Sequence, residues 1–180
     1  MEEASAAVDL RYPIGEFQPP AGITASDRAR LIDEIASLPG RLRSAIEGLD
    51  EVQLNTPYRP GGWTARQVVH HFADSHMNSF VRFKLALTEH SPVIKPYDEG
   101  AWAETADSRN MPVGSSLALI DGQHQRWAAL LRSLNGQQYR RTFMHPERGL
   151  LTLDATLAIY AWHCRHHTAH VVRLRERMGW

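Results

Sequence analysis

Residues 153–178 read LDATLAIYAWHCRHHTAHVVRLRERM, a stretch without glycine or proline that lies between Thr152 and Gly179. Threonine is a favoured residue at a helix N-terminus, and glycine is favoured just past a helix C-terminus. The last turns contain three arginines, whose positive charge complements the carbonyl end of a helix. We therefore expect one long helix over residues 153–178.

A second helix is predicted over residues 65–88, which also contain no glycine or proline. Thr64 precedes this segment and lies three residues before Gln67, which is the spacing of a capping box. A third helix is predicted from about Ser115 to Leu134, because apolar residues recur there at helical spacing and Asn135-Gly136 follows as a stop signal.

A further amphipathic segment begins near Ser26 and continues to Leu49. Its apolar residues recur at steps of three and four, which is typical of a helix. Pro39-Gly40 falls in its middle and predicts a kink or break. The apolar positions are Leu31, Ile32, Ile35, Leu38, Leu42, Ile46 and Leu49.

Four long helices and no convincing paired strands predict an all-α four-helix bundle. We expect a single domain over residues 1–180, with residues 1–25 as an N-terminal arm. The connections of roughly 14, 26 and 17 residues exceed the turns of a simple up-down bundle, so crossover connections are possible. The connection 90–112 is long enough to be functional or to form a turn of its own. Residues 139–151 are expected to be irregular or weakly extended.

The charge balance excludes several partner classes. The chain has 20 Lys+Arg and 20 Asp+Glu residues, so no overall field attracts nucleic acid or an anionic membrane. No apolar run approaches the roughly 20 residues of a membrane-spanning helix. Cys164 is the single cysteine, and residues 1–8 lack the pattern of a signal peptide. We therefore expect a cytoplasmic protein without disulfides, in which Cys164 is a buried structural thiol.

Histidines are the distinctive feature of the composition, with ten in the chain and four of them between His163 and His170. His163 and His167 lie one helical turn apart, about 40° from each other around the axis, so both can reach one metal ion. In the zinc-protease helix a glutamate follows the first histidine, whereas Cys164 occupies that position here. His170 lies on the same stripe, and His166 is rotated about 60° to the other side.

A catalytic metal needs at least a third protein ligand, which a facing helix would supply. His70 and His71 are adjacent and diverge by about 100°, so only one can face the bundle interior. Four polar residues lie within about 40° of His71 and suggest a wet cavity: Gln67, Ser75, Asn78 and Arg82. His70 shares its face with Asp74, which favours a simple imidazole–carboxylate pair on the surface.

Other interpretations of the histidines stay open at this point. A His-x-x-x-His pair on an amphipathic helix is often only solvated or packed, and four close histidines could form a polar seam. We expect His76, His90 and His124 at the surface, because they have no partner pattern. His145 lies in a loop that either approaches the mouth of the bundle or has no role.

Several segments resemble the YfiT branch of the DinB-like family, and the likeness extends from about Tyr12 to Trp180. The segments are 12–15 (YPIG), 61–64 (GGWT), 66–71 (RQVVHH), 74–79 (DSHMNS), 82–84 (RFK), 95–98 (KPYD), 145–146 (HP), 160–163 (YAWH), 166–167 (HH) and 169–170 (AH). Each motif alone is weak, but together they are specific.

The resemblance implies a four-helix bundle with up-down-down-up connectivity and one divalent metal ion per chain, nickel or zinc, held by three histidines. In that pattern the first ligand lies eight residues after Trp63, at His71, and the others are His163 and His167. The resemblance also implies a homodimer. Members of the branch include candidate metal-dependent hydrolases, and some relatives are S-transferases that join bacillithiol or another small thiol to an electrophile.

Three functions follow as hypotheses, each without nucleic acid or membrane as a partner. The first is a hydrolase that acts on a small molecule through metal-activated water. The second is a thiol S-transferase in which the metal stabilises a thiolate. The third is a non-catalytic, stress-related metal-binding bundle. Asn78 and Arg82 are candidates for contacting the substrate or for supporting the metal ligands from behind. Arg82 either binds a carboxylate of a thiol cofactor or forms a structural salt bridge.

Overall fold

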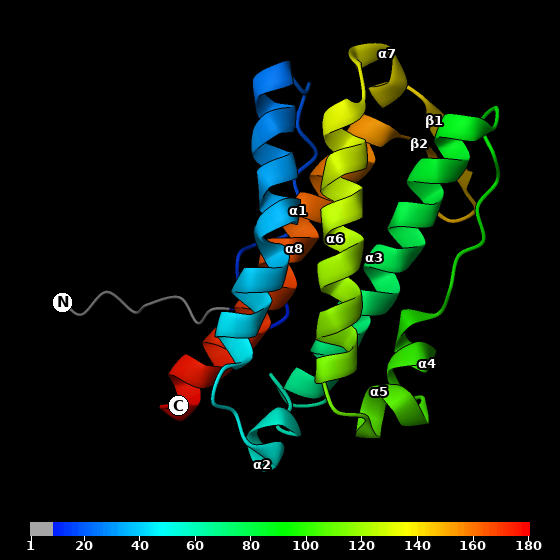
Figure 1. Cartoon of the computed structure of the whole chain (residues 1–180). Helices are drawn as coiled ribbons and strands as arrows, with labels where there is room; N and C mark the ends of the chain where they lie inside the picture. The colour runs from blue at the N-terminus through cyan, green and yellow to red at the C-terminus, as the bar shows by residue number, and fades with distance from the viewer. Residues whose placement is uncertain (1–8) are drawn as a thin grey trace.

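The structure, a computed structural model, describes residues 9–180 and contains four long helices that form a bundle (Figure 1). The long helices are α1 (Ala25–Ile46), α3 (Ala65–Thr88), α6 (Gly114–Ser133) and α8 (Leu153–Met178). The shorter elements are α2 (Glu51–Leu54), α4 (Glu99–Ala103), α5 (Ala106–Asn110), α7 (Gly136–Tyr139), β1 (Thr142–His145) and β2 (Gly149–Thr152).

The bundle has the up-down-down-up connectivity that the resemblance implied. In Figure 1, α1 and α8 run downward, whereas α3 and α6 run upward. The parallel pair α1 and α8 packs side by side, and so does the parallel pair α3 and α6. Parallel neighbours need a connection that returns along the whole bundle, and residues 89–113 provide it between α3 and α6. The connection between α3 and α6 is therefore a crossover, as its length made possible.

Local capping signals set the ends of α3 and α8 where the sequence predicted them. The Thr64 hydroxyl accepts a hydrogen bond from the Gln67 amide at 3.1 Å, and the Gln67 side chain accepts one from the Thr64 amide at 2.9 Å. Thr152 caps α8 through the Ala155 amide at 3.0 Å. Gly179 follows α8 with φ of +71°, a left-handed conformation that glycine adopts without strain.

The first helix differs from its prediction in two respects. It continues through Pro39 without a break and ends at Ile46, so Leu49 lies beyond it. The helix tolerates the proline because packing outweighs the loss of one backbone hydrogen bond: Ile35, Leu38 and Leu42 are fully buried. The predicted helix 115–134 is observed one residue earlier, as Gly114–Ser133.

Residues 142–152 form an antiparallel hairpin, so the expectation of no paired strands was wrong. Thr142 pairs with Thr152 and His145 with Gly149. Strands of four residues are too short to show alternation in the sequence. The crossover is attached to β1 by two backbone hydrogen bonds, from the Ile94 amide to the Met144 carbonyl at 3.0 Å and from the Met144 amide to the Pro92 carbonyl at 2.8 Å.

A continuous hydrophobic core lies between the four long helices. Trp127 of α6 is its largest fully buried side chain and contacts Phe83 of α3 and Tyr160 of α8 edge-on. Cys164 is buried in this core as expected, and burial raises the pKa of its thiol to about 12. None of the helices described in residues 9–180 has the length and apolar character that crossing a membrane requires.

Candidate metal centre

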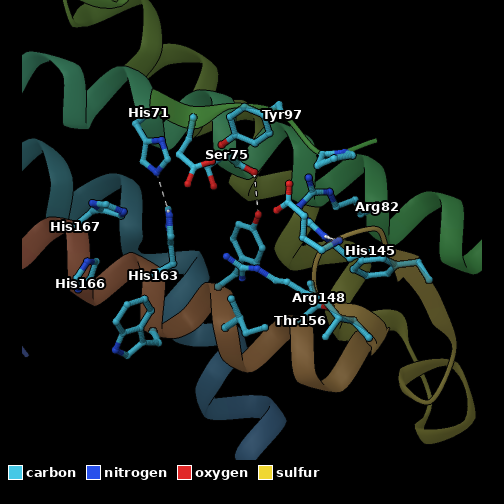
Figure 2. Close-up of a pocket in the computed structure, with 18 of the residues that line it drawn as sticks. His71, Ser75, Arg82, Tyr97, His145, Arg148, Thr156, His163, His166 and His167 are labelled. Carbon is cyan, nitrogen blue, oxygen red and sulfur yellow. Dashed lines mark hydrogen bonds between the residues drawn. The ribbon is translucent and has the colours of Figure 1, made fainter. Parts of the chain in front are cut away.

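Three histidines from two helices meet at the inner wall of a cavity between α3 and α8. They are His71 on α3 and the one-turn pair His163 and His167 on α8, and Figure 2 shows their rings converging. One possible ligand atom from each lies within 4.8 Å of the others. The sequence-predicted triad therefore forms one cluster in space.

The spacing of these rings fits a tetrahedral cation. The Nε2 atoms of His71 and His163 are 3.2 Å apart. Two imidazole nitrogens bound to one tetrahedral zinc at about 2.0–2.1 Å would lie about 3.3 Å apart, which agrees closely. The ring of His167 is centred 4.4 Å from that of His163 and 4.7 Å from that of His71, so it can complete a three-ligand face.

Burial keeps these imidazoles neutral. It lowers the pKa of His71 to about 3, and it lowers the pKa of His163 and His167 well below 6.5. The neighbouring histidines act in the same direction, since two positive rings would repel each other. Neutral imidazole is the form that binds metal, so the site needs no deprotonation at pH 7.

An aromatic shell surrounds the cluster. The ring of Trp63 is centred 4.6 Å from that of His71, and Phe72 lies edge-on to His163 and His167 at 5.8 Å. Such a shell limits access of water to a bound ion and lowers the local dielectric. The cavity is therefore the open side of the site.

His76 and His124 are not surface residues, contrary to expectation. Both are essentially buried, with 0% and 1% of their surface exposed. His163 Nδ1 lies 3.0 Å from His76 Nε2, His76 Nδ1 lies 2.8 Å from His124 Nε2, and His124 Nδ1 lies 2.7 Å from the carbonyl oxygen of Ile35 in α1. We call this hydrogen-bonded series His163–His76–His124–Ile35 the Ile35 relay.

A similar series begins at His167. Its Nδ1 lies 3.2 Å from Nδ1 of His170, and Nε2 of His170 lies 3.1 Å from the carbonyl oxygen of Arg11 in the N-terminal arm. We call the series His167–His170–Arg11 the Arg11 relay. The ring of His170 also stacks on Tyr58 at 3.9 Å, which fixes its plane.

His166 forms a second possible ligand group with His167 and His170. Its ring stacks on Trp162 at 4.2 Å, and its Nδ1 has no hydrogen-bond partner within residues 9–180. This group shares His167 with the triad. The hydrogen bond between His167 Nδ1 and His170 leaves only Nε2 of His167 for a metal ion, so the two groups cannot each bind an ion through His167.

His70 points away from the cluster and does not pair with Asp74. Its Nδ1 lies 2.7 Å from the Ser116 hydroxyl and its Nε2 lies 3.1 Å from the Met111 carbonyl, so it joins α3 to the start of α6. Asp74 is partly buried, which raises the pKa of its carboxyl to about 6. The structure therefore places His71 at the cluster and gives His70 a bridging contact.

The cavity beside the cluster has a volume of about 300 Å³ and a polar wall (Figure 2). Ser75 and Arg82 of α3 line it, as the polar stripe predicted. Gln67 instead donates to the Ala103 carbonyl at 2.7 Å, and Asn78 donates to the Asp74 carbonyl at 2.9 Å. Neither Gln67 nor Asn78 is among the residues that line the cavity.

Two lining residues, Tyr97 of the crossover and Arg148 of the hairpin, were not expected from the sequence. His145, also on the hairpin, lines the cavity, which agrees with the first of the two alternatives for it. In Figure 2, the side chain of Arg148 reaches across the cavity from the hairpin. Neither Arg148 nor Arg82 forms an ion pair or a side-chain hydrogen bond with any residue in the range 9–180, so both guanidinium groups can bind a ligand, beside Glu99 and Glu147, which line the same cavity.

The comparison with known families agrees with this geometry. A family model described as the DinB superfamily matches residues 34–171. The chain belongs to the DinB superfamily. Its match spans most of the bundle and includes all three histidines of the cluster.

Relatives of this DinB-superfamily chain cover nearly its whole length. YfiT of Bacillus subtilis is 50% identical over 175 residues, which are 97% of this chain and 98% of YfiT. BcerKBAB4_2443 of Bacillus mycoides is 55% identical over 172 residues, which are 96% of this chain and 99% of the relative. The names of both describe them as candidate metal-dependent hydrolases.

Two solved structures have a similar fold. YfiT superposes with a TM-score of 0.93 at 50% identity, over 95% of this chain and 98% of its own, and is described as a four-helix bundle of unusual topology. TT2238, a four-helix bundle protein, superposes with a TM-score of 0.55 at 19% identity, over 85% of this chain and 99% of its own. At that identity the likeness shows the fold alone.

Proposed function

We propose that this protein is a metal-dependent hydrolase that acts on a small molecule and holds one divalent cation, zinc or nickel, per chain. The ligands are His71, His163 and His167. The observation that supports this most directly is the cluster itself, three neutral imidazoles with metal-like spacing at the wall of a cavity. A three-histidine face leaves at least one coordination position for a reactant.

A bound cation would supply Lewis acidity, which favours the deprotonated form of a coordinated water or of a coordinated thiol. The surrounding residues control access to that site. Trp63 and Phe72 exclude bulk water from the sides of the cluster, so a reactant enters through the cavity. No protein nucleophile is required, and the buried Cys164, with its raised pKa, does not face the cavity.

The two arginines indicate a substrate with an anionic group. Arg82 and Arg148 approach the cavity from α3 and from the hairpin. A guanidinium binds a carboxylate or a phosphate with paired hydrogen bonds. We expect one end of the substrate to lie between these side chains while the reacting end lies at the histidine cluster.

A thiol S-transferase is the second candidate, and the same arginines favour it. A small thiol that carries carboxylate groups could place them on Arg82 and Arg148 and its sulfur at the cluster. Its partner in the reaction would be an electrophile, and the protein would need no further catalytic group. The two candidates differ in the reactant and share the site.

Elemental analysis of untagged protein, prepared without added metal, tests the common basis of both candidates. About one zinc or nickel per chain is expected, and its loss is expected in His163→Ala. Ester and amide substrates, assayed beside a panel of thiols with a fluorogenic electrophile, then separate hydrolase from transferase. Metal-loaded protein that turns over none of them would favour a binding bundle, and protein without metal would refute every one of these functions. Light scattering of the same sample tests the predicted homodimer.

A further inference from the structure

We propose that two backbone carbonyls, those of Ile35 and Arg11, fix the tautomers of the two metal ligands on α8 through the Ile35 relay and the Arg11 relay. In this inference His76, His124 and His170 are positioning residues that aim the lone pairs of His163 and His167 at one point. The inference rests on the proposed metal site, but the tautomers themselves can be measured without metal.

The Ile35 relay has only one consistent direction when its rings are neutral. A carbonyl oxygen can only accept, so Nδ1 of His124 must donate to Ile35. A neutral imidazole has one N–H group, which leaves Nε2 of His124 as an acceptor. His76 must then donate from Nδ1 to His124 and accept on Nε2.

The same reasoning extends to the ligand. Because Nε2 of His76 accepts, His163 must donate to it from Nδ1. Nε2 of His163 then has no hydrogen and directs its lone pair toward His71, whose Nε2 is 3.2 Å away. One carbonyl on α1 thus determines which nitrogen of a ring on α8 can bind a cation.

The Arg11 relay gives the equivalent result for His167. Nε2 of His170 must donate to the Arg11 carbonyl, so Nδ1 of His170 accepts from Nδ1 of His167. Nε2 of His167 is left with its lone pair. Two independent series, which end on different parts of the chain, therefore prepare the same nitrogen on both ligands.

A purely structural role does not account for these arrangements. Buried imidazoles are expensive to desolvate, and Leu or Phe would fill the same core volume more favourably. Metal-binding histidines generally donate their other N–H to a carboxylate, a carbonyl or water, which fixes tautomer and ring orientation. Here neutral histidines connect the ligands to distant carbonyls, so no negative charge is buried next to the cluster.

The variants His124→Leu and His124→Gln test the Ile35 relay. Leucine removes the acceptor for His76, so His76 and His163 are free to adopt the reversed tautomers, in which Nε2 of His163 carries the hydrogen. Glutamine carries both a donor for Ile35 and an acceptor for His76. Zinc affinity, measured by competition with a chromophoric chelator, should fall about 10–100-fold in His124→Leu and recover in His124→Gln.

Gln123→Leu is the matched control. Gln123 is the neighbour of His124 on α6, is 8% exposed, and its amide atoms have no partner within residues 9–180. Its replacement changes a buried polar residue to leucine without touching the relay. We expect zinc affinity equal to that of the wild type. His124→Leu that is folded and binds zinc as tightly as this control would overturn the proposal.

Nitrogen NMR of the histidine side chains provides a second test that does not depend on the stability of any variant. In the wild-type protein we expect His163, His76, His124 and His167 to carry their proton on Nδ1, and His170 on Nε2. A proton on Nε2 of His163 in metal-free protein would refute the Ile35 relay. If the protein binds no metal, the proposed function fails, whereas this measurement still decides the tautomers.

Discussion

Mild acid is expected to unfold the metal-free protein through its buried histidines. Burial is the main cause that lowers the pKa of seven histidines far below 6.5: His71, His76, His124, His163, His166, His167 and His170. Of these, His71 has a pKa of about 3, and His124, His166 and His170 have values of about 4. The unfolded chain has ordinary histidines, which take up protons below pH 6.5.

The sign of the effect follows from this difference. The unfolded state binds more protons than the folded state below pH 6.5, so the free energy of unfolding decreases as pH falls. Each such histidine costs about 1 kcal/mol between pH 6.5 and pH 5.5, and seven together cost about 7 kcal/mol. That loss is comparable to the entire stability of an ordinary domain, about 5–15 kcal/mol. Asp74, whose pKa is raised, acts in the opposite direction but is a single group.

Urea denaturation in the presence of a chelator, followed by circular dichroism at pH 7.5, 6.5 and 5.5, measures this dependence. We expect a decrease of about 2 kcal/mol over the first pH unit and about 7 kcal/mol over the second. His124→Gln removes one buried histidine and should lessen the second decrease by about 1 kcal/mol. A decrease below about 2 kcal/mol between pH 6.5 and pH 5.5 would show that the folded protein accepts protons at these rings, and would contradict their lowered pKa values.

Three further outcomes are expected. His163→Ala removes one of three ligands and should abolish stoichiometric metal in elemental analysis, while far-UV circular dichroism stays helical. Arg82→Ala and Arg148→Ala should raise KM for anionic substrates by about 10-fold or more and leave KM for a neutral analogue unchanged, since a charged hydrogen bond contributes about 1.5–3 kcal/mol; equal effects on both substrates would contradict the anion site. His170→Leu should weaken zinc binding by about 10-fold and His170→Gln should weaken it less, as measured by chelator competition.

The parts of the fold that the sequence predicted well depend on signals within one helix. Thr64 and Gln67 form a capping box from residues three apart, and Gly179 ends α8 by its own backbone conformation. The spacing of His163 and His167 fixed their shared face in the same way. These features do not depend on which residues lie on the facing helices. The helix limits and the ligand pair could therefore be predicted from the sequence.

The remaining features depend on contacts between distant segments. His124 lies four residues after Ile120 and three before Trp127, both fully buried, so its place on the apolar stripe was a signal that it faces inward. Its partner His76 is 48 residues away on another helix, and the helical period gives no information about such a pairing. Arg148 reaches the cavity because a short hairpin places it there, and the four-residue strands of that hairpin are too short to show alternation in the sequence.

The pairing of parallel helices also has a consequence for the rate of folding. Helical bundles that fold in microseconds bring together mainly segments that are close in the sequence. Here α1 packs along α8, although α1 ends at Ile46 and α8 begins only at Leu153. A large loop must therefore close before these two helices can bury their apolar faces against each other. We therefore expect refolding to be slower than in an up-down bundle of the same size, with the docking of α8 as the step that completes both the core and the histidine cluster.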